Sequence, residues 1–234
     1  MRLSARFFRF GAVCAALTVL TTLIVHVLPN AWGDVSSFEQ QVELRLNPAY
    51  LANRWGVLLH CVLVIMSMLA LGAAIVRREP AFAVTGFLGF LCFGFTEILR
   101  TSISIFAVNR TWRAGYAAAA DDATRERFRS FLTAYSGVND ALFFLFDTAF
   151  LAGLICYALG FLKQEGRMSR IGVLFSVWAV LTLPPILDAA QGRQLLGPYF
   201  EWVGPWFLPL ARAYVAFWLW RNAPKLDWQV AHPA

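Results

Sequence analysis

Apolar residues in this chain gather in long runs, and these runs constrain the fold more than any other feature. A helix of about 20 residues spans the hydrocarbon layer of a bilayer, which is about 30 Å thick. Only 15% of the 234 residues are charged, compared with about a quarter in a typical soluble domain. The pattern predicts an all-α, polytopic membrane protein with a single transmembrane domain over residues 1–234. Six spans are expected, over residues 8–28, 56–76, 81–108, 138–162, 171–190 and 199–220.

Basic residues lie in alternate connections between the predicted spans, as the positive-inside rule requires of cytoplasmic segments. They are Arg2, Arg6, Arg9, Arg77, Arg78, Lys163, Arg167, Arg170, Arg221 and Lys225. This distribution predicts an inner (plasma) membrane protein with both termini in the cytoplasm. It also accounts for the net charge of +6, so nucleic acid is not expected as a partner. The expected partners are the lipid bilayer and either further copies of the chain or a membrane complex.

The first outer loop is expected to contain a short amphipathic helix. Ser36 and Glu39 have the spacing of a capping box, in which two side chains satisfy the backbone at the start of a helix. Asn47-Pro48 has the pattern of an N-cap followed by the first helical residue. The helix of the second span therefore begins well before the bilayer.

The second outer loop is expected to contain another short amphipathic helix, capped by Asp121 or Asp122. Apolar side chains repeat on one face of this segment, and arginines occupy much of the remainder. Ser136-Gly137 predicts a break in the chain before the fourth span.

Ionisable residues within the predicted spans are costly, so each needs a partner or a use. Glu97 and Arg100 are three residues apart in the third span and share a helix face with Thr101 and Ser104. Counting depth along each helix places the ionisable residues in the outer half of the bundle. They are His26, His60, Glu97, Arg100, Asp147, Asp188, Glu201 and Arg212. This predicts a polar chamber that faces outward.

The leading functional hypothesis is non-enzymatic binding of a small polar or amphiphilic ligand in that chamber, by a sensor, a lipid-handling protein or a transport-related protein. Arg100 and Arg212 would bind an anionic group, and Glu97 or Asp147 would bind cations or protons. The structural alternative remains open, in which Glu97 and Asp147 neutralise the two arginines and hold helices together.

Two further hypotheses involve the histidines. In a membrane-embedded enzyme, His26 and His60 would join Asp147 or Glu97 as metal ligands or as acid–base groups. In a haem b or quinone protein, the two histidines would be axial ligands. Absence of a cofactor is the main expectation, with haem or a divalent metal as the alternatives. The known hydrolase and zinc motifs do not occur in the sequence.

The region from Glu97 to the fifth span resembles an uncharacterised family of bacterial six-helix integral membrane proteins, a domain of unknown function. The features that carry the likeness are the acid in the third span, a long outer loop, Gly153 and Gly160 in the fourth span, and the basic loop and helix start over residues 163–174. The resemblance implies a six-helix architecture and a bacterial source, and it implies no activity.

Overall fold

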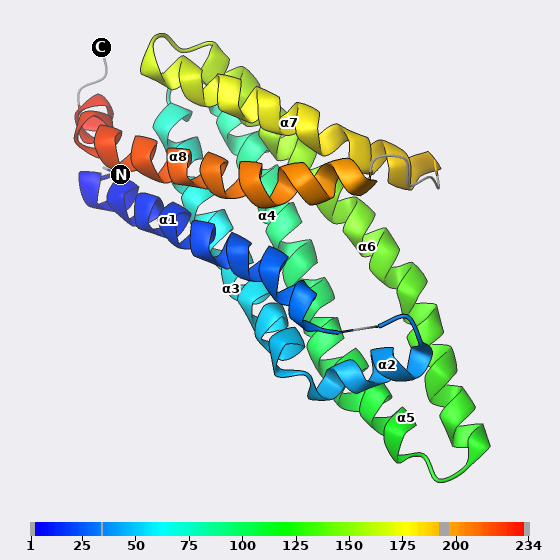
Figure 1. Cartoon of the computed structure of the whole chain (residues 1–234). Coiled ribbons are helices and arrows are strands. Elements are labelled where there is room, and N and C mark those ends of the chain that lie inside the picture. Colours follow the sequence, from blue (N-terminus) through cyan, green and yellow to red (C-terminus); the bar gives the residue numbers. More distant parts are fainter. Residues whose placement is uncertain (1–2, 34, 192–196, 232–234) are drawn as a thin grey trace.

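The protein is helical throughout the part that the computed structural model describes, which is residues 3–33, 35–191 and 197–231 (Figure 1). For residues 197–204 and 227–231 only the backbone is described. The elements are α1 (Ala5–Val27), η1 (Leu28–Ala31), α2 (Phe38–Glu43), η2 (Leu44–Leu46), α3 (Pro48–Ile75), α4 (Pro80–Ile103), the π-helix η3 (Ser104–Arg113), α5 (Ala114–Ala118), α6 (Asp122–Leu162), α7 (Arg167–Gln191) and α8 (Gly197–Ala231).

Five helical segments are long and apolar enough to cross a membrane. They are Ala5–Ala31, Pro48–Ile75, Pro80–Ala118, Asp122–Leu162 and Arg167–Gln191. The predicted all-α class is therefore confirmed, and the segments fit a multi-pass membrane protein. The sixth predicted span falls in α8, whose side chains are described only from residue 205 to residue 226, and it stays a prediction.

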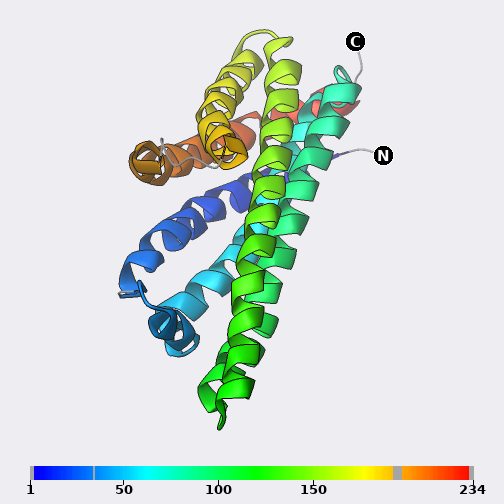
Figure 2. The ribbon, with the colours of Figure 1, turned by 90° about the vertical axis from the view of Figure 1, so that its right-hand side faces the viewer.

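The long helices pack in the order α8, α1, α3, α4, α6 and α7, and each contacts the next along a large part of its length. The helices α7 and α8 contact each other only slightly. Figure 2 shows α4 and α6 running side by side, with α7 to their left and with α1, α3 and α8 passing behind them. All six helices thereby surround a common interior.

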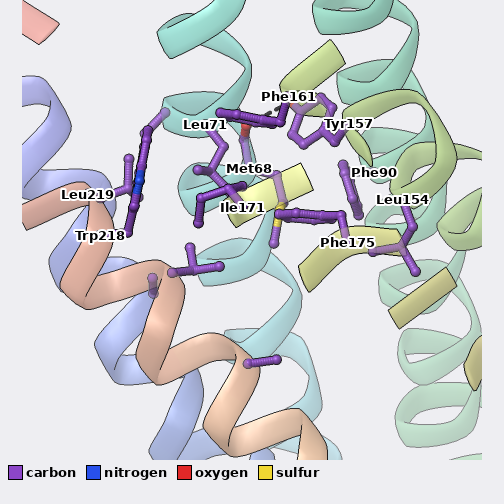
Figure 3. Close-up of a cluster of buried hydrophobic side chains, with 14 of the residues drawn as sticks. Met68, Leu71, Phe90, Leu154, Tyr157, Phe161, Ile171, Phe175, Trp218 and Leu219 are labelled. Carbon is purple, nitrogen blue, oxygen red and sulfur yellow. Dashed lines mark hydrogen bonds between the residues drawn. The ribbon is translucent and has the colours of Figure 1, made fainter. Parts of the chain in front are cut away.

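One half of this interior is a tightly packed apolar core centred on Tyr157 (Figure 3). The Tyr157 hydroxyl donates a hydrogen bond to the Met68 carbonyl oxygen at 2.7 Å. Its ring fills a notch left by Gly72 and Gly86, where a Cβ atom would collide with the ring. The Phe90 ring meets it edge-on, with centroids 5.0 Å apart. Tyr157 therefore fixes α6 against both α3 and α4.

A second pair of glycines allows the backbones of α4 and α6 to approach closely. A Cβ atom on Gly89 would lie 2.7 Å from the Gly153 nitrogen and 2.9 Å from the Ala149 oxygen. Both are backbone atoms that cannot rotate away. Small residues at such contacts are a common means of packing helices in membranes.

Two of the predicted helix starts are confirmed. The Asn47 side chain accepts hydrogen bonds from the backbone N–H groups of Ala49 and Tyr50 at the start of α3. The Asp121 carboxylate accepts hydrogen bonds from the backbone N–H and the hydroxyl of Thr124, which keep the pKa of Asp121 below its ordinary value. The charged form of this cap is therefore favoured.

The predicted break at Ser136-Gly137 is wrong, because α6 continues through it from Asp122 to Leu162. The segment expected as a separate amphipathic helix is the first part of α6. A glycine inside a helix costs only about 1 kcal/mol relative to alanine, and the remainder of this 41-residue helix outweighs that cost.

The capping box of the first outer helix also differs from the prediction. It is formed by Ser37 and Gln40, not by Ser36 and Glu39, and the helix that it starts is the six-residue α2. This helix rests on the end of the bundle. Glu39 lies 3.6 Å from the Arg129 guanidinium of α6, and the Phe38 ring meets the Tyr116 ring of α5 edge-on.

We expect Gly89→Ala to destabilise the protein by about 1–3 kcal/mol, because the added methyl group forces α4 and α6 apart. Gly137→Ala is the matched control, since a Cβ atom there meets nothing within 4 Å. It should stabilise α6 by about 0.5–1 kcal/mol. Thermal unfolding of the two variants in detergent would test this, and equal midpoints would contradict the proposed close contact.

Candidate functional site

A cavity of about 400 Å³ lies in the other half of the bundle, and we call it the central cavity. Its walls come from α1, η1, α3, α4, α6, α7 and α8. Its charged and polar lining residues include Thr22, His26, Asn53, Arg54, His60, Glu97, Arg100, Asp147, Thr182 and Arg212.

The structure brings six of the eight candidate residues together at this cavity: His26, His60, Glu97, Arg100, Asp147 and Arg212. Asp188 belongs to the last turn of α7 and is not among the lining residues. The side chain of Glu201 lies outside the described residues. These six residues come from five different helices. They meet because of the depth at which each one lies along its helix.

Glu97 and Arg100 form a bidentate ion pair within α4. The Arg100 Nε and Nη2 atoms each donate to a Glu97 carboxylate oxygen at 2.6 Å. The third nitrogen, Nη1, donates to the Asn139 Oδ1 atom of α6 at 2.9 Å. The pair itself therefore joins no two helices, and the connection to α6 comes from Asn139, which the sequence did not single out.

Arg212 is buried, with only 5% of its surface exposed, and it lines the central cavity from α8. Among the described residues no carboxylate lies within 4 Å of it, and its Nε and Nη1 atoms have no hydrogen-bond partner. The guanidinium carbon lies 5.4 Å from the centre of the Trp178 ring. Within the described residues, the structural alternative is therefore seen for Arg100, which Glu97 neutralises, and not for Arg212.

The two histidines differ in their surroundings. The His60 Nδ1 atom lies 2.7 Å from the Thr21 hydroxyl of α1, so this hydrogen bond orients the imidazole ring. His26 lines the same cavity one helix away. No group of three His, Cys, Asp or Glu side chains suited to a metal ion is found within the described residues.

Aromatic rings form one wall of the central cavity, which we call the aromatic wall. It consists of Phe93, Phe143, Phe146, Phe150 and Trp178. The Phe93 ring centre lies 4.5 Å from that of Phe146 and 4.7 Å from that of Phe150. These residues lie in apolar runs, where nothing in the sequence separates a cavity wall from a lipid-facing surface.

Two further lining residues were also missed as site residues. Arg54 precedes the predicted second span, and Trp32 follows the predicted first span. The Arg54 guanidinium lies 5.4 Å from the Trp32 ring centre and 4.9 Å from the Tyr50 ring centre. The extension of α3 to Pro48 brings Arg54 into the bundle.

Comparison of the chain with models of protein families, with curated proteins and with solved structures finds no match. The resemblance to the uncharacterised bacterial six-helix family is not tested by this result, and the function is argued from the site.

We expect Glu97→Gln to destabilise the protein by about 3 kcal/mol, because it leaves the guanidinium of Arg100 without its carboxylate partner in a largely buried position. The side chains of Glu97 and Arg100 are 6% and 13% exposed. Denaturant unfolding would measure the change.

Glu79→Gln is the control, because the Glu79–Lys163 pair is more exposed and such pairs contribute about 1 kcal/mol or less. The double variant Glu97→Gln/Arg100→Gln should recover part of the lost stability. Equal effects of Glu79→Gln and Glu97→Gln would show that burial does not strengthen the Glu97–Arg100 pair.

Proposed function

We propose that this chain is a six-span bacterial inner-membrane protein that binds a small amphiphilic ligand in the central cavity, as a sensor, a lipid-handling protein or a transport-related protein. In this proposal α8 supplies the sixth span and both termini are cytoplasmic. The basic connections between spans support this orientation. The cavity then opens toward the outer side of the membrane.

The observation that carries the proposal is the buried guanidinium of Arg212, two of whose nitrogens have no partner among the described residues. Leaving a buried charge uncompensated costs several kcal/mol. The Trp178 ring recovers only part of this cost, since a cation–π contact contributes about 2 kcal/mol when desolvated. Arg212 therefore favours a ligand group that accepts hydrogen bonds and carries negative charge.

The rest of the ligand is expected to be apolar, because the aromatic wall lies in the same cavity. Ligand sites in proteins typically have volumes of about 300–1,000 Å³ and are lined mainly by apolar side chains with a few placed polar groups. A cavity of about 400 Å³ with this lining suits a small amphiphile better than a fully hydrated ion.

Asp147 is the second charged group that remains for a ligand. It lines the cavity from α6, and no cation lies within 4 Å of its carboxylate among the described residues. Together with the oriented His60 ring, it adds a polar group to the cavity that the guanidinium groups line. A ligand with a hydroxyl or amino group beside its anionic group matches this set.

We expect Arg212→Met to reduce ligand retention at least about tenfold, the effect of about 1.4 kcal/mol in binding. The same variant should unfold at an equal or higher temperature when no ligand is present, because it removes an uncompensated buried charge. Mass spectrometry of small molecules and lipids extracted from the purified protein, set against the protein-free micelle background, would measure retention.

The matched control is Arg221→Met, which removes an exposed arginine of the same helix. This variant should retain the wild-type amount of the enriched compound. A lower unfolding temperature for Arg212→Met with unchanged retention would show that Arg212 has a structural role, and would refute the proposal. Absence of any compound enriched with the wild-type protein would refute it as well.

A further inference from the structure

A second cavity of about 420 Å³ lies at the end of the bundle where α2 meets η3, and we call it the end cavity. Its walls include α2, η2, α3, η3 and the first part of α6. Three residues, Trp32, Arg54 and Arg100, line both the end cavity and the central cavity. They form the wall between the two.

The charged residues among the described lining of the end cavity are all arginines. Arg54, Arg100 and Arg113 line it, whereas no Asp or Glu is among its described lining residues. The charge of Arg100 is offset by Glu97, which binds it from α4. The surplus comes from Arg54 and Arg113, and in the described chain neither has a carboxylate within 4 Å.

The guanidinium groups of Arg54 and Arg113 both make cation–π contacts with the Tyr50 ring. The guanidinium carbon of Arg54 lies 4.9 Å from the centre of the Tyr50 ring, and that of Arg113 lies 5.1 Å from it. Tyr50 is buried, and its hydroxyl lies 3.1 Å from the Ser104 hydroxyl. Two like charges held on one buried ring repel each other, and an anion in contact with both removes the repulsion.

Unused hydrogen-bond donors lie in the wall of this cavity. The Arg54 Nε and Trp32 Nε1 atoms are buried and have no hydrogen-bond partner in the parts of the chain that the structure describes. A buried donor without an acceptor costs about 1–3 kcal/mol. The neutral side chains of Thr133, Ser136 and Asn139 also line the cavity and add polar groups to it.

We infer that the end cavity binds a phosphate-type oxyanion through Arg54 and Arg113. The guanidinium fork matches the oxygens of a phosphate group, and a surplus of two positive charges suits a phosphate monoester or diester. The site shares Arg54 with the wall of the central cavity, and the inference does not depend on the ligand proposed for that cavity. The phosphate group belongs either to a soluble compound or to the headgroup of an anionic phospholipid.

The test uses the full chain in dodecyl maltoside micelles, which contain no phosphate. Thermal unfolding, followed by tryptophan fluorescence, is measured with added glycerol 3-phosphate at constant ionic strength set by chloride. It is measured again in mixed micelles that contain phosphatidylglycerol or, as the uncharged match, diacylglycerol. We expect the unfolding temperature to rise with one of the two phosphate compounds, because binding to the folded state alone stabilises it. The compound that acts identifies the source of the phosphate group.

Arg113→Gln and Arg54→Gln should each weaken this binding at least about tenfold, the effect of losing one charge-assisted hydrogen bond. Arg110→Gln is the matched control, because Arg110 belongs to the same π-helix, is exposed and does not line the cavity. Arg212→Met should keep the response, which separates this site from the central cavity.

The inference is overturned if neither phosphate compound raises the unfolding temperature more than chloride or diacylglycerol does. It is also overturned if Arg113→Gln and Arg54→Gln respond like Arg110→Gln, since the phosphate then binds elsewhere. A variant that fails to fold is replaced by Arg113→Lys, which keeps the charge and removes the fork. We expect Arg113→Lys to bind more weakly than the wild type and more strongly than Arg113→Gln.

Discussion

One half of the bundle contains buried charges, and the need to compensate each of them constrains its structure. A guanidinium removed from water needs a carboxylate, a ring or a ligand, because desolvation otherwise outweighs what packing contributes. Arg100 has the carboxylate of Glu97. Arg54 has the Trp32 and Tyr50 rings, and among the described residues Arg212 has only the Trp178 ring. The three arginines therefore range from fully paired to nearly unpaired, and the least paired of them, Arg212, lines the central cavity.

The apolar half of the bundle, around Tyr157, offsets the cost of these buried arginines. There the Tyr157 ring fits the notch of Gly72 and Gly86, and Gly89 allows α4 to contact the backbone of α6. Such contacts specify helix positions closely, because interiors are packed without voids and transmit small displacements. The packed half holds the helices, so the cavity half can carry charges that do not stabilise the fold. Rigid support of this kind is what a binding site requires of its surroundings.

The sequence predicted the features that follow from one helix at a time. Run lengths predicted the long helices, short-range patterns predicted the caps at Asn47 and Asp121, and depth placed His60 and Arg212 in the same half of the bundle. Features that depend on a second helix were missed. Arg54 falls in the helix predicted to begin at Asn47-Pro48, but nothing in the local pattern indicates that it meets Trp32. Gly137 was interpreted as a break because a glycine destabilises a helix locally. That local cost does not show that the helical residues on either side keep α6 continuous.

The wall shared by the two cavities bears on what can occupy them. Arg54, Trp32 and Arg100 line both spaces, so a ligand that reorients any of them in one cavity changes the other. Such coupling is reciprocal by thermodynamic necessity. Two separate anions, one at Arg113 and one at Arg212, would repel each other through a medium of low dielectric constant. An anion in one cavity should therefore weaken the binding of an anion in the other.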